Sequence, residues 1–396
     1  MKKANKFFLL GALILTILSC TKDPDNGGTG VEGVTPILLE CLYSNDIVLS
    51  NHNIDGVDYI VDCELEIRNG TFEIEPGTTI QFNQGASLVI ENNGVIRALG
   101  NSGLPITMTG TDSGRATWRG IYINSSTGAN QFEHVVIEDA GDGETFGQFT
   151  TNHAAVTFQG RLSMTNCTIE NSGSNGILSE ESLTLSRVDA FENNRIIGCR
   201  DFPVLVNQNH IANMSLPSCT FIENGDNMIG IHQGNGDRLT VESSFEALDI
   251  PYFIDEGLDL FASLTLKSGV EIVMGNGSYV NNNSSTNSFL LIQGTQSNHV
   301  TIRGKEALRG YWEGIYMTAD NSLNIWEFLD LSDGGFSVQG HGDLAGNITL
   351  EFGARLTINN CTSSRSGGDC DIVLSDFGGL PTLENNSPDI DSICEE

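Results

Sequence analysis

Apolar and polar residues alternate over short segments from about residue 40 to the C-terminus. The segments 87–90, 94–99 and 106–109 each place apolar side chains at alternate positions, and Gly, Asn and Ser separate them. Alternation with a period of two predicts strands, and the separators predict turns. No stretch in this range has sustained helical periodicity with caps, so the helices that a βαβ protein needs are not expected. The pattern predicts an all-β fold.

The sequence contains a duplication. Residues 118–122 (WRGIY) recur as 312–316 (WEGIY), which is 194 positions later (312 − 118), and residues 161–168 recur with the same offset as 355–362. A fixed offset between similar segments is typical of proteins that stack repeated units. We therefore expect two tandem homologous units in one continuous stack. The first would span 41–249, and the second, shortened at its end, would span 250–396.

Several short motifs resemble a known family. They are, in chain order, residues 75–80 (EPGTTI), 94–100 (GVIRALG), 105–106 (PI), 118–121 (WRGI) and 135–137 (VVI). This order resembles the pattern of right-handed parallel β-helix surface lipoproteins of Gram-negative bacteria. The resemblance implies a triangular solenoid in which each winding adds three short strands. Inward apolar side chains would then stack on their counterparts one winding away.

The N-terminus is typical of an exported protein. Three lysines precede the uncharged stretch 7–18, which is too short for a membrane-spanning helix of about 20 residues. Residues 17–20 (ILSC) resemble the bacterial lipobox, which implies removal of the signal peptide 1–19 and lipidation of Cys20. The alternative is an ordinary signal peptide that is followed by an incidental cysteine.

Residues 20–40 begin with a polar, Gly-rich and Asp-rich stretch, which predicts a flexible tether behind the lipidated cysteine. Lys22, Asp23 and Asp25 resemble the export signal that sends some Gram-negative lipoproteins to the cell surface. We expect a lipid anchor in the outer membrane with the protein facing the cell exterior. The periplasmic face is the alternative.

Charge narrows the set of partners. The chain has 51 acidic and 19 basic residues and a net charge of −32. Nucleic acid is not an expected partner, because affinity for it comes from cationic groups that displace phosphate counterions. An anionic membrane surface is disfavoured for the same reason, so membrane contact should come through the lipid anchor. The remaining candidate partners are a polysaccharide or a surface protein.

Eight cysteines remain besides Cys20. An even number of cysteines in a protein of an oxidising compartment is compatible with disulfide pairing. Cys41 and Cys63 are 22 residues apart, and Cys370 and Cys394 are 24 residues apart. Both spacings equal about one winding, and neighbouring windings bring Cα atoms within the range of a disulfide. Each pair is therefore a candidate disulfide.

Three further cysteines, Cys167, Cys219 and Cys361, each precede a threonine at a step where a small apolar side chain would face the core. We expect them to be buried packing residues. The chain has no Cys-x-x-Cys pair and no histidine cluster with zinc spacing, so no zinc site is expected.

An acidic loop at 138–144 is a candidate metal site. Asp139, Asp142 and Glu144 could supply oxygen ligands to calcium beside a glycine turn. The equivalent loop of the second unit keeps Asp333 but lacks counterparts of the other two, which favours ordinary solvated carboxylates. No other cofactor is expected.

Duplicated aromatic and acidic residues are candidates for ligand binding. Aromatic faces suit pyranose rings, and two carboxylates hold register between the units. These candidates are Trp118, Tyr122, Glu133, Trp312, Tyr316 and Glu327. The alternative is that Trp-x-Gly-Ile-Tyr is the packing signature of one winding, and that the two glutamates are solvated.

No catalytic residues are predicted. With a constant offset the histidines of the two units do not coincide; His153, for example, falls opposite Asn347. We expect a surface lipoprotein that acts as a binding or adhesion scaffold for glycan or protein. A polysaccharide lyase or hydrolase with a calcium-assisted site is the alternative, because parallel β-helices also host such enzymes. A purely structural spacer is a third hypothesis.

Overall fold

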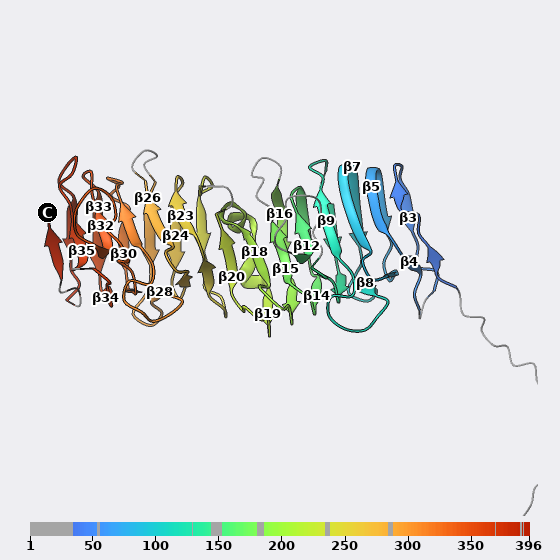
Figure 1. Cartoon of the computed structure of the whole chain (residues 1–396). Helices are drawn as coiled ribbons and strands as arrows, with labels where there is room; N and C mark the ends of the chain where they lie inside the picture. Colours follow the sequence, from blue (N-terminus) through green and yellow to red (C-terminus); the bar gives the residue numbers. More distant parts are fainter. Residues whose placement is uncertain are drawn as a thin grey trace, which may run out of the picture. The chain divides into compact units, whose positions relative to one another are not determined.

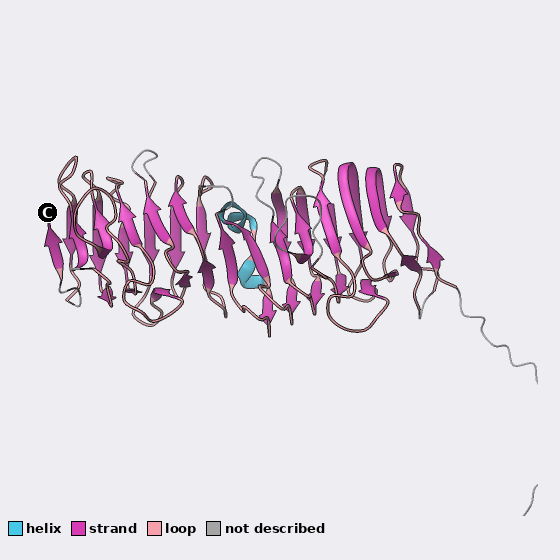
Figure 2. Cartoon of the chain, viewed as in Figure 1, coloured by secondary structure: helices cyan, strands magenta, loops and turns pink. Residues whose placement is uncertain are grey.

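A computed structural model describes residues 35–53, 56–128, 130–143, 153–179, 186–233, 238–283, 288–368, 370–388, 390 and 392–396. Strands dominate these residues and pair in parallel in four sheets (Figures 1 and 2). The prediction of an all-β fold is confirmed.

The bounds of the strands are given sheet by sheet. The first sheet contains β1 (Ile37–Leu38), β4 (Tyr59–Val61), β6 (Thr79–Phe82), β8 (Ile106–Gly110), β11 (Val135–Glu138), β14 (Thr168–Glu170), β17 (Arg195–Ile197) and β19 (Thr220–Ile222). The second contains β2 (Leu42–Tyr43), β3 (Ile47–Leu49), β5 (Glu64–Ile74), β7 (Ser87–Leu99), β9 (Gly120–Asn124), β10 (Asn130–Glu133), β12 (Ala154–Phe158), β13 (Arg161–Thr165), β15 (Asn175–Ser179), β16 (Arg187–Glu192), β18 (Val204–Asn207), β20 (Ile229–His232), β22 (Tyr252–Ile254), β25 (Glu271–Met274), β28 (Val300–Gly304), β31 (Leu329–Ser332) and β34 (Thr362–Ser364).

The third sheet contains β21 (Ser243–Phe245), β24 (Leu264–Lys267), β27 (Leu290–Gln293), β30 (Ile325–Glu327), β33 (Arg355–Asn359) and β36 (Thr382–Asn385). The fourth contains β23 (Gly257–Leu260), β26 (Tyr279–Asn282), β29 (Gly314–Met317), β32 (Gly346–Leu350), β35 (Cys370–Leu374) and β37 (Ile393–Glu395). Two short 3₁₀ helices, η1 (Gln208–Asn213) and η2 (Leu216–Ser218), complete the described elements.

Apolar ladders form the core between the sheets. In the second sheet, Ile121 pairs in register with Val156, which pairs with Ile177, and the series continues through Val204 to Ile229. All five side chains are buried. Burying one such side chain contributes roughly 1.5–3 kcal/mol. The alternation of apolar residues in the sequence therefore produces ladders that run from strand to strand.

Buried asparagines tie neighbouring strands together. Asn130 and Asn324 occupy equivalent positions in the duplicated sequence, and each accepts a hydrogen bond through Oδ1 from a backbone N–H. Their Nδ2 groups donate to the carbonyl oxygens of the equivalent residues Arg161 and Arg355, at 2.9 and 3.1 Å. Both side chains therefore satisfy their polar atoms in the interior, which burial without partners would make costly.

Strands that are equivalent in the duplicated sequence lie in different sheets. β9 belongs to the second sheet and its counterpart β29 to the fourth, while β11 belongs to the first and β31 to the second. From β14 to β17 the chain passes β15 and β16. From β19 to β22 it passes β20, a bridge between Leu239 and Leu260, and β21. Between β19 and β22 the chain therefore forms one strand-like segment more than between β14 and β17. Every later strand consequently lies in a different sheet from its counterpart in the duplicated sequence.

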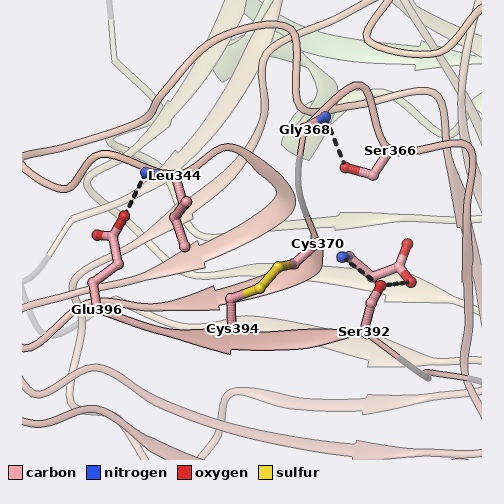
Figure 3. The surroundings of a disulfide bond; sticks show 8 residues. Leu344, Ser366, Gly368, Cys370, Ser392, Cys394 and Glu396 are labelled. Carbon is pink, nitrogen blue, oxygen red and sulfur yellow. Dashed lines mark hydrogen bonds between the residues drawn. A yellow bond between two sulfur atoms is a disulfide. The ribbon is translucent and has the colours of Figure 1, made fainter.

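Both cysteine pairs that their sequence spacing made candidates are disulfides. The Cα atoms of Cys41 and Cys63 are 5.9 Å apart, and those of Cys370 and Cys394 are 6.0 Å apart (Figure 3). The second bond connects β35 to β37, which pair in register. It therefore fastens the last strand of the fourth sheet to its neighbour.

The remaining described cysteines follow the prediction with one exception. Cys167 and Cys361 are buried, as expected, and so is Cys199. Cys219 is only partly buried, so the prediction for it is wrong. The reason is its position: it leads into β19, which is the last strand of the first sheet and has a neighbour on one side only. Burial raises the pKa of Cys167 and Cys199 to about 12, which keeps these thiols protonated and unreactive.

The signal peptide 1–19 and Cys20 lie outside the described residues. The prediction of a tether over 20–40 is wrong at its C-terminal end, because Ile37 and Leu38 pair with Tyr59 and Ile60 as a strand. Residues 20–34 lie outside the described residues. The segment's apolar end explains this difference, since apolar residues can join the sheet. In the described ranges, no helix has the length and apolar character that crossing a membrane requires.

Candidate functional site

The duplicated tryptophans are packing residues. Trp118 and Trp312 are fully buried. Their indole N–H groups donate to the backbone oxygens of Glu138 and Ser332, both at 2.8 Å, and Trp118 stacks on Phe82 with ring centroids 4.0 Å apart. Neither ring offers a face to a sugar, which corrects the stacking hypothesis for these two residues. The structure agrees with the alternative interpretation as a packing signature.

The two glutamates in register lie on exposed positions at the ends of β10 and β30. Glu133 pairs with Thr165, and Glu327 pairs with Gln293 and Asn359. The two residues belong to different sheets. The structure therefore does not bring them together with each other.

The acidic loop is only partly described. Asp139 accepts a hydrogen bond from Asn171 Nδ2, and Asp142 is half-buried with its backbone N–H donating to a carbonyl oxygen. Glu144 lies outside the described residues. Asp139 is thus engaged by a neighbouring amide rather than pointing into open space.

Metal-type ligands converge elsewhere in the described ranges. There, the one group of three such ligands with atoms within 4.8 Å of one another consists of Cys41, Asp62 and Cys63. Its two sulfur atoms are bonded to each other. A disulfide sulfur is not a thiolate ligand, so this group does not fit a metal ion.

A different cluster lies on the fourth sheet. Tyr316 of β29 donates its hydroxyl to Glu351 Oε2 at 2.7 Å. His341, from the connection between β31 and β32, donates its backbone N–H to Glu351 Oε1 at 2.8 Å, and its Nδ1 lies 3.2 Å from Oε2. The carboxylate is fully buried, whereas 52% of the His341 side chain is exposed. The buried Glu351 carboxylate therefore fixes the position of a histidine whose side chain is half-exposed.

These contacts shift two pKa values in opposite directions. Burial alone would raise the pKa of Glu351, but hydrogen bonds from Tyr316 and His341 outweigh it and lower the pKa. Burial and the bond to the Glu351 carboxylate raise the pKa of Tyr316. The pair is thus an ionised carboxylate and a neutral phenol, and a charge-assisted hydrogen bond of this kind is stronger than a neutral one.

His341 belongs to an exposed aromatic group. Its ring stacks on that of Phe377 with centroids 4.3 Å apart and planes 2° apart. The ring of Phe352 meets both at close to a right angle, at 5.3 and 5.5 Å. Phe352 is 38% exposed and Phe377 is 49% exposed. Large aromatic faces that remain in solvent are suited to contact a ligand.

A hollow of about 370 Å³ opens beside this aromatic group. Its lining residues are His341, Gly342, Asp343, Leu344, Ser375, Asp376, Phe377 and Glu396. We call it the C-terminal hollow.

The last strand stabilises one wall of the hollow. The Glu396 side chain accepts hydrogen bonds from the backbone N–H groups of Asp343 and Leu344, and the second of these is visible in Figure 3. Glu396 directly follows β37, which the Cys370–Cys394 disulfide connects to β35. The loop that carries His341 therefore donates hydrogen bonds to two carboxylates, those of Glu351 and Glu396.

Tyr122, the counterpart of Tyr316 in the duplicated sequence, makes a neutral version of the tyrosine contact. Tyr122 donates to Gln159 Oε1 at 3.1 Å. Gln159 follows β12 as Glu351 follows β32, and their offset is 192 (351 − 159), two fewer than in the neighbouring motifs. The same shift places His153 opposite Ala345, so its predicted alignment with Asn347 is wrong. A two-residue deletion before these strands hid the correspondence.

Sequence reasoning therefore found Tyr316 but missed His341, Glu351 and Phe377. An alignment that allowed gaps would have shown an acid in place of Gln159. In comparisons with known proteins, no family model matched the chain, and neither did any curated protein or solved structure.

Proposed function

We propose that this protein is a lipid-anchored surface protein whose right-handed parallel β-helix presents a glycan-binding site at the C-terminal hollow. It acts as a scaffold rather than as an enzyme. The proposal has three parts, namely the solenoid, the anchor and the ligand, and each has its own support.

The pairing of the strands supports the solenoid. Ile80 of β6 pairs with Tyr59 of β4 and Met108 of β8, so each strand lies between those one winding before and after it. The equivalent contacts of Tyr122 and Tyr316 support two tandem units. Both units would wind around one axis with a shift of one sheet between them.

The signal peptide 1–19 and the lipobox-like residues before Cys20 support the anchor. Acyl chains on Cys20 would hold the protein in the outer membrane, facing the cell exterior. Cells fed labelled palmitate should label the wild-type chain and not the Cys20→Ala variant. Labelling of both would contradict the anchor, and an antibody reaching the protein only in permeabilised cells would contradict the outward orientation.

The C-terminal hollow is the observation that carries the ligand assignment. Phe377 is half-exposed, and because His341 stacks on one face of its ring, a sugar would place its apolar C–H face on the opposite one. Asp343, Asp376 and Glu396 add carboxylate oxygens at the edge, which accept hydrogen bonds from sugar hydroxyls. A concave site with an aromatic wall and a few polar groups is the usual form of a small-ligand site.

A glycan array probed with residues 20–396 tests this assignment. The screen is run with calcium and again with chelator. We expect binding that Phe377→Ala abolishes and that Phe336→Ala leaves unchanged. Phe336 is a matched control, because it is 61% exposed in the same unit and does not line the hollow. Equal loss in both variants, or no binding to any glycan, would contradict the assignment.

One observation favours a polysaccharide lyase or hydrolase as the second candidate. With its proton on Nδ1, His341 donates to Glu351, and Nε2 keeps a lone pair that could remove a proton from a bound sugar. Calcium would then neutralise an acidic substrate. Polysaccharides incubated with the protein and calcium should yield no unsaturated fragments or new reducing ends if the scaffold proposal is right. Products that disappear in His341→Ala would establish the enzyme instead.

A further inference from the structure

We infer that the C-terminal hollow prefers sugars with free amino groups to neutral sugars and excludes polyuronates. This inference rests on the proposed glycan-binding function and adds the class of glycan. It starts from the charges that surround the aromatic wall.

The residues that line the hollow carry negative charge at its rim. Asp343 and Asp376 are exposed at its edge. The Glu396 carboxylate also lines the hollow and accepts a hydrogen bond from the backbone N–H of Asp343. The lining includes no lysine or arginine, and its one basic side chain, His341, is turned toward Glu351. A bound ammonium group would meet carboxylates, and a bound uronate would meet like charges.

The aromatic wall adds a second attraction for a cation. An ammonium group within about 6 Å of the face of an aromatic ring is attracted by the ring's quadrupole. Phe377 is half-exposed beside the two rim aspartates. A glucosamine ring stacked on Phe377 could therefore place its amino group above the face of the ring and close to a carboxylate.

A bare metal ion fits this arrangement less well than an amine. In the described ranges, the lining of the hollow has no three carboxylate, histidine or cysteine ligand atoms within 4.8 Å of one another. An organic cation that also fills the space beside Phe377 uses both the charges and the cavity, which a small ion cannot.

Isothermal titration calorimetry on residues 20–396 tests the preference. Three oligosaccharides of equal length serve as probes: a glucosamine oligomer, its N-acetylated form and an oligogalacturonate. We expect the glucosamine oligomer to bind roughly five- to tenfold more tightly than the N-acetylated one, as two exposed ion pairs allow. Added salt should reduce the difference, and the oligogalacturonate should not bind.

Variants separate a local preference from the attraction of a chain with a net charge of −32. The double variant Asp343→Asn with Asp376→Asn should bind both glucosamine forms equally. Asp112→Asn, an exposed aspartate of the first unit, should keep the preference. A preference that survives the double variant would overturn the inference.

The outcomes also distinguish this inference from the proposed function. Equal affinity of the wild-type protein for the two glucosamine forms would overturn the preference and leave glycan binding intact. If none of the three probes binds and the array also finds no ligand, both fail.

Discussion

The duplication allows the strength of a buried tyrosine contact to be measured against its own counterpart. Tyr316 donates to a buried carboxylate at 2.7 Å, and Tyr122 donates to an amide oxygen at 3.1 Å. Hydrogen bonds to charged groups contribute about 1.5–3 kcal/mol, and neutral ones about 0.5–1.5 kcal/mol. Tyr316→Phe should therefore lower the free energy of unfolding by about 1 kcal/mol more than Tyr122→Phe.

The charge on Glu351 is the expected source of this excess. In a Glu351→Gln background Tyr316 donates to a glutamine amide oxygen as Tyr122 does, so Tyr316→Phe should cost no more than Tyr122→Phe. Because the folded-state pKa of Glu351 lies below its ordinary value of 4.5, its contribution is fully present above about pH 4.5. It is lost as the pH falls through the lowered pKa.

Urea denaturation at pH 7 of five proteins measures these differences, namely the wild type, Tyr122→Phe, Tyr316→Phe, Glu351→Gln and the double variant Glu351→Gln with Tyr316→Phe. The measurement at low pH adds the titration of the carboxylate. Equal costs of the two tyrosine variants at pH 7, or an excess that persists after Glu351→Gln, would refute the reasoning.

Three other predictions concern stability and the hollow. Burial lowers the pKa of His210 from 6.5 to about 4. Between pH 7 and pH 5, the free energy of unfolding of the wild type, measured by urea titration, should therefore fall by about 2 kcal/mol more than that of His210→Gln. An equal dependence of the two free energies on pH would contradict this burial. Cys394→Ser should lower the free energy of unfolding by about 3–4 kcal/mol, measured by thermal unfolding, and should weaken glycan binding. Cys63→Ser should lower stability alone. Undiminished glycan binding by Cys394→Ser would show that the hollow does not need the disulfide that connects β37 to β35. Asn324→Leu should cost about 2–3 kcal/mol by calorimetry because three backbone groups lose their partner, and a neutral effect would remove these asparagines from the account.

Local patterns predicted the features that depend on neighbouring strands. Alternation over 106–109 predicted that Ile106 and Met108 share one face of a strand, because a strand turns successive side chains to opposite faces, and both are buried. The spacing of Cys370 and Cys394 pointed to a bond between adjacent strands for the same reason. These predictions needed only the period of the strand and the length of a winding.

The duplicated Trp-x-Gly-Ile-Tyr motif shows where pattern alone was insufficient. Its glycines, Gly120 and Gly314, have φ values of 111° and 109°. A Cβ at Gly120 would lie 2.6 Å from the carbonyl oxygen of Ala155. The motif is therefore maintained by backbone conformation and packing. Similarity between the units could not distinguish that cause from a binding function.

The hollow could not be predicted because its parts are distant in the sequence and have no counterparts in the earlier copy of the duplicated sequence. Leu344 and Glu396 are 52 residues apart, and their contact depends on where the last strand lies. His341 lies in a connection whose length differs between the units. Neither position has a period or a fixed offset that the sequence could reveal.

Saturation-transfer NMR tests the central claim most directly, namely that a sugar ring lies on Phe377 in the C-terminal hollow. The probe is the glucosamine oligomer, mixed with residues 20–396 or with the Phe377→Ala variant. We expect the strongest transfer to the C–H protons on one face of a sugar ring, and we expect the variant to lose it while Phe336→Ala keeps it. Equal transfer in Phe377→Ala and in the wild-type protein would contradict the claim.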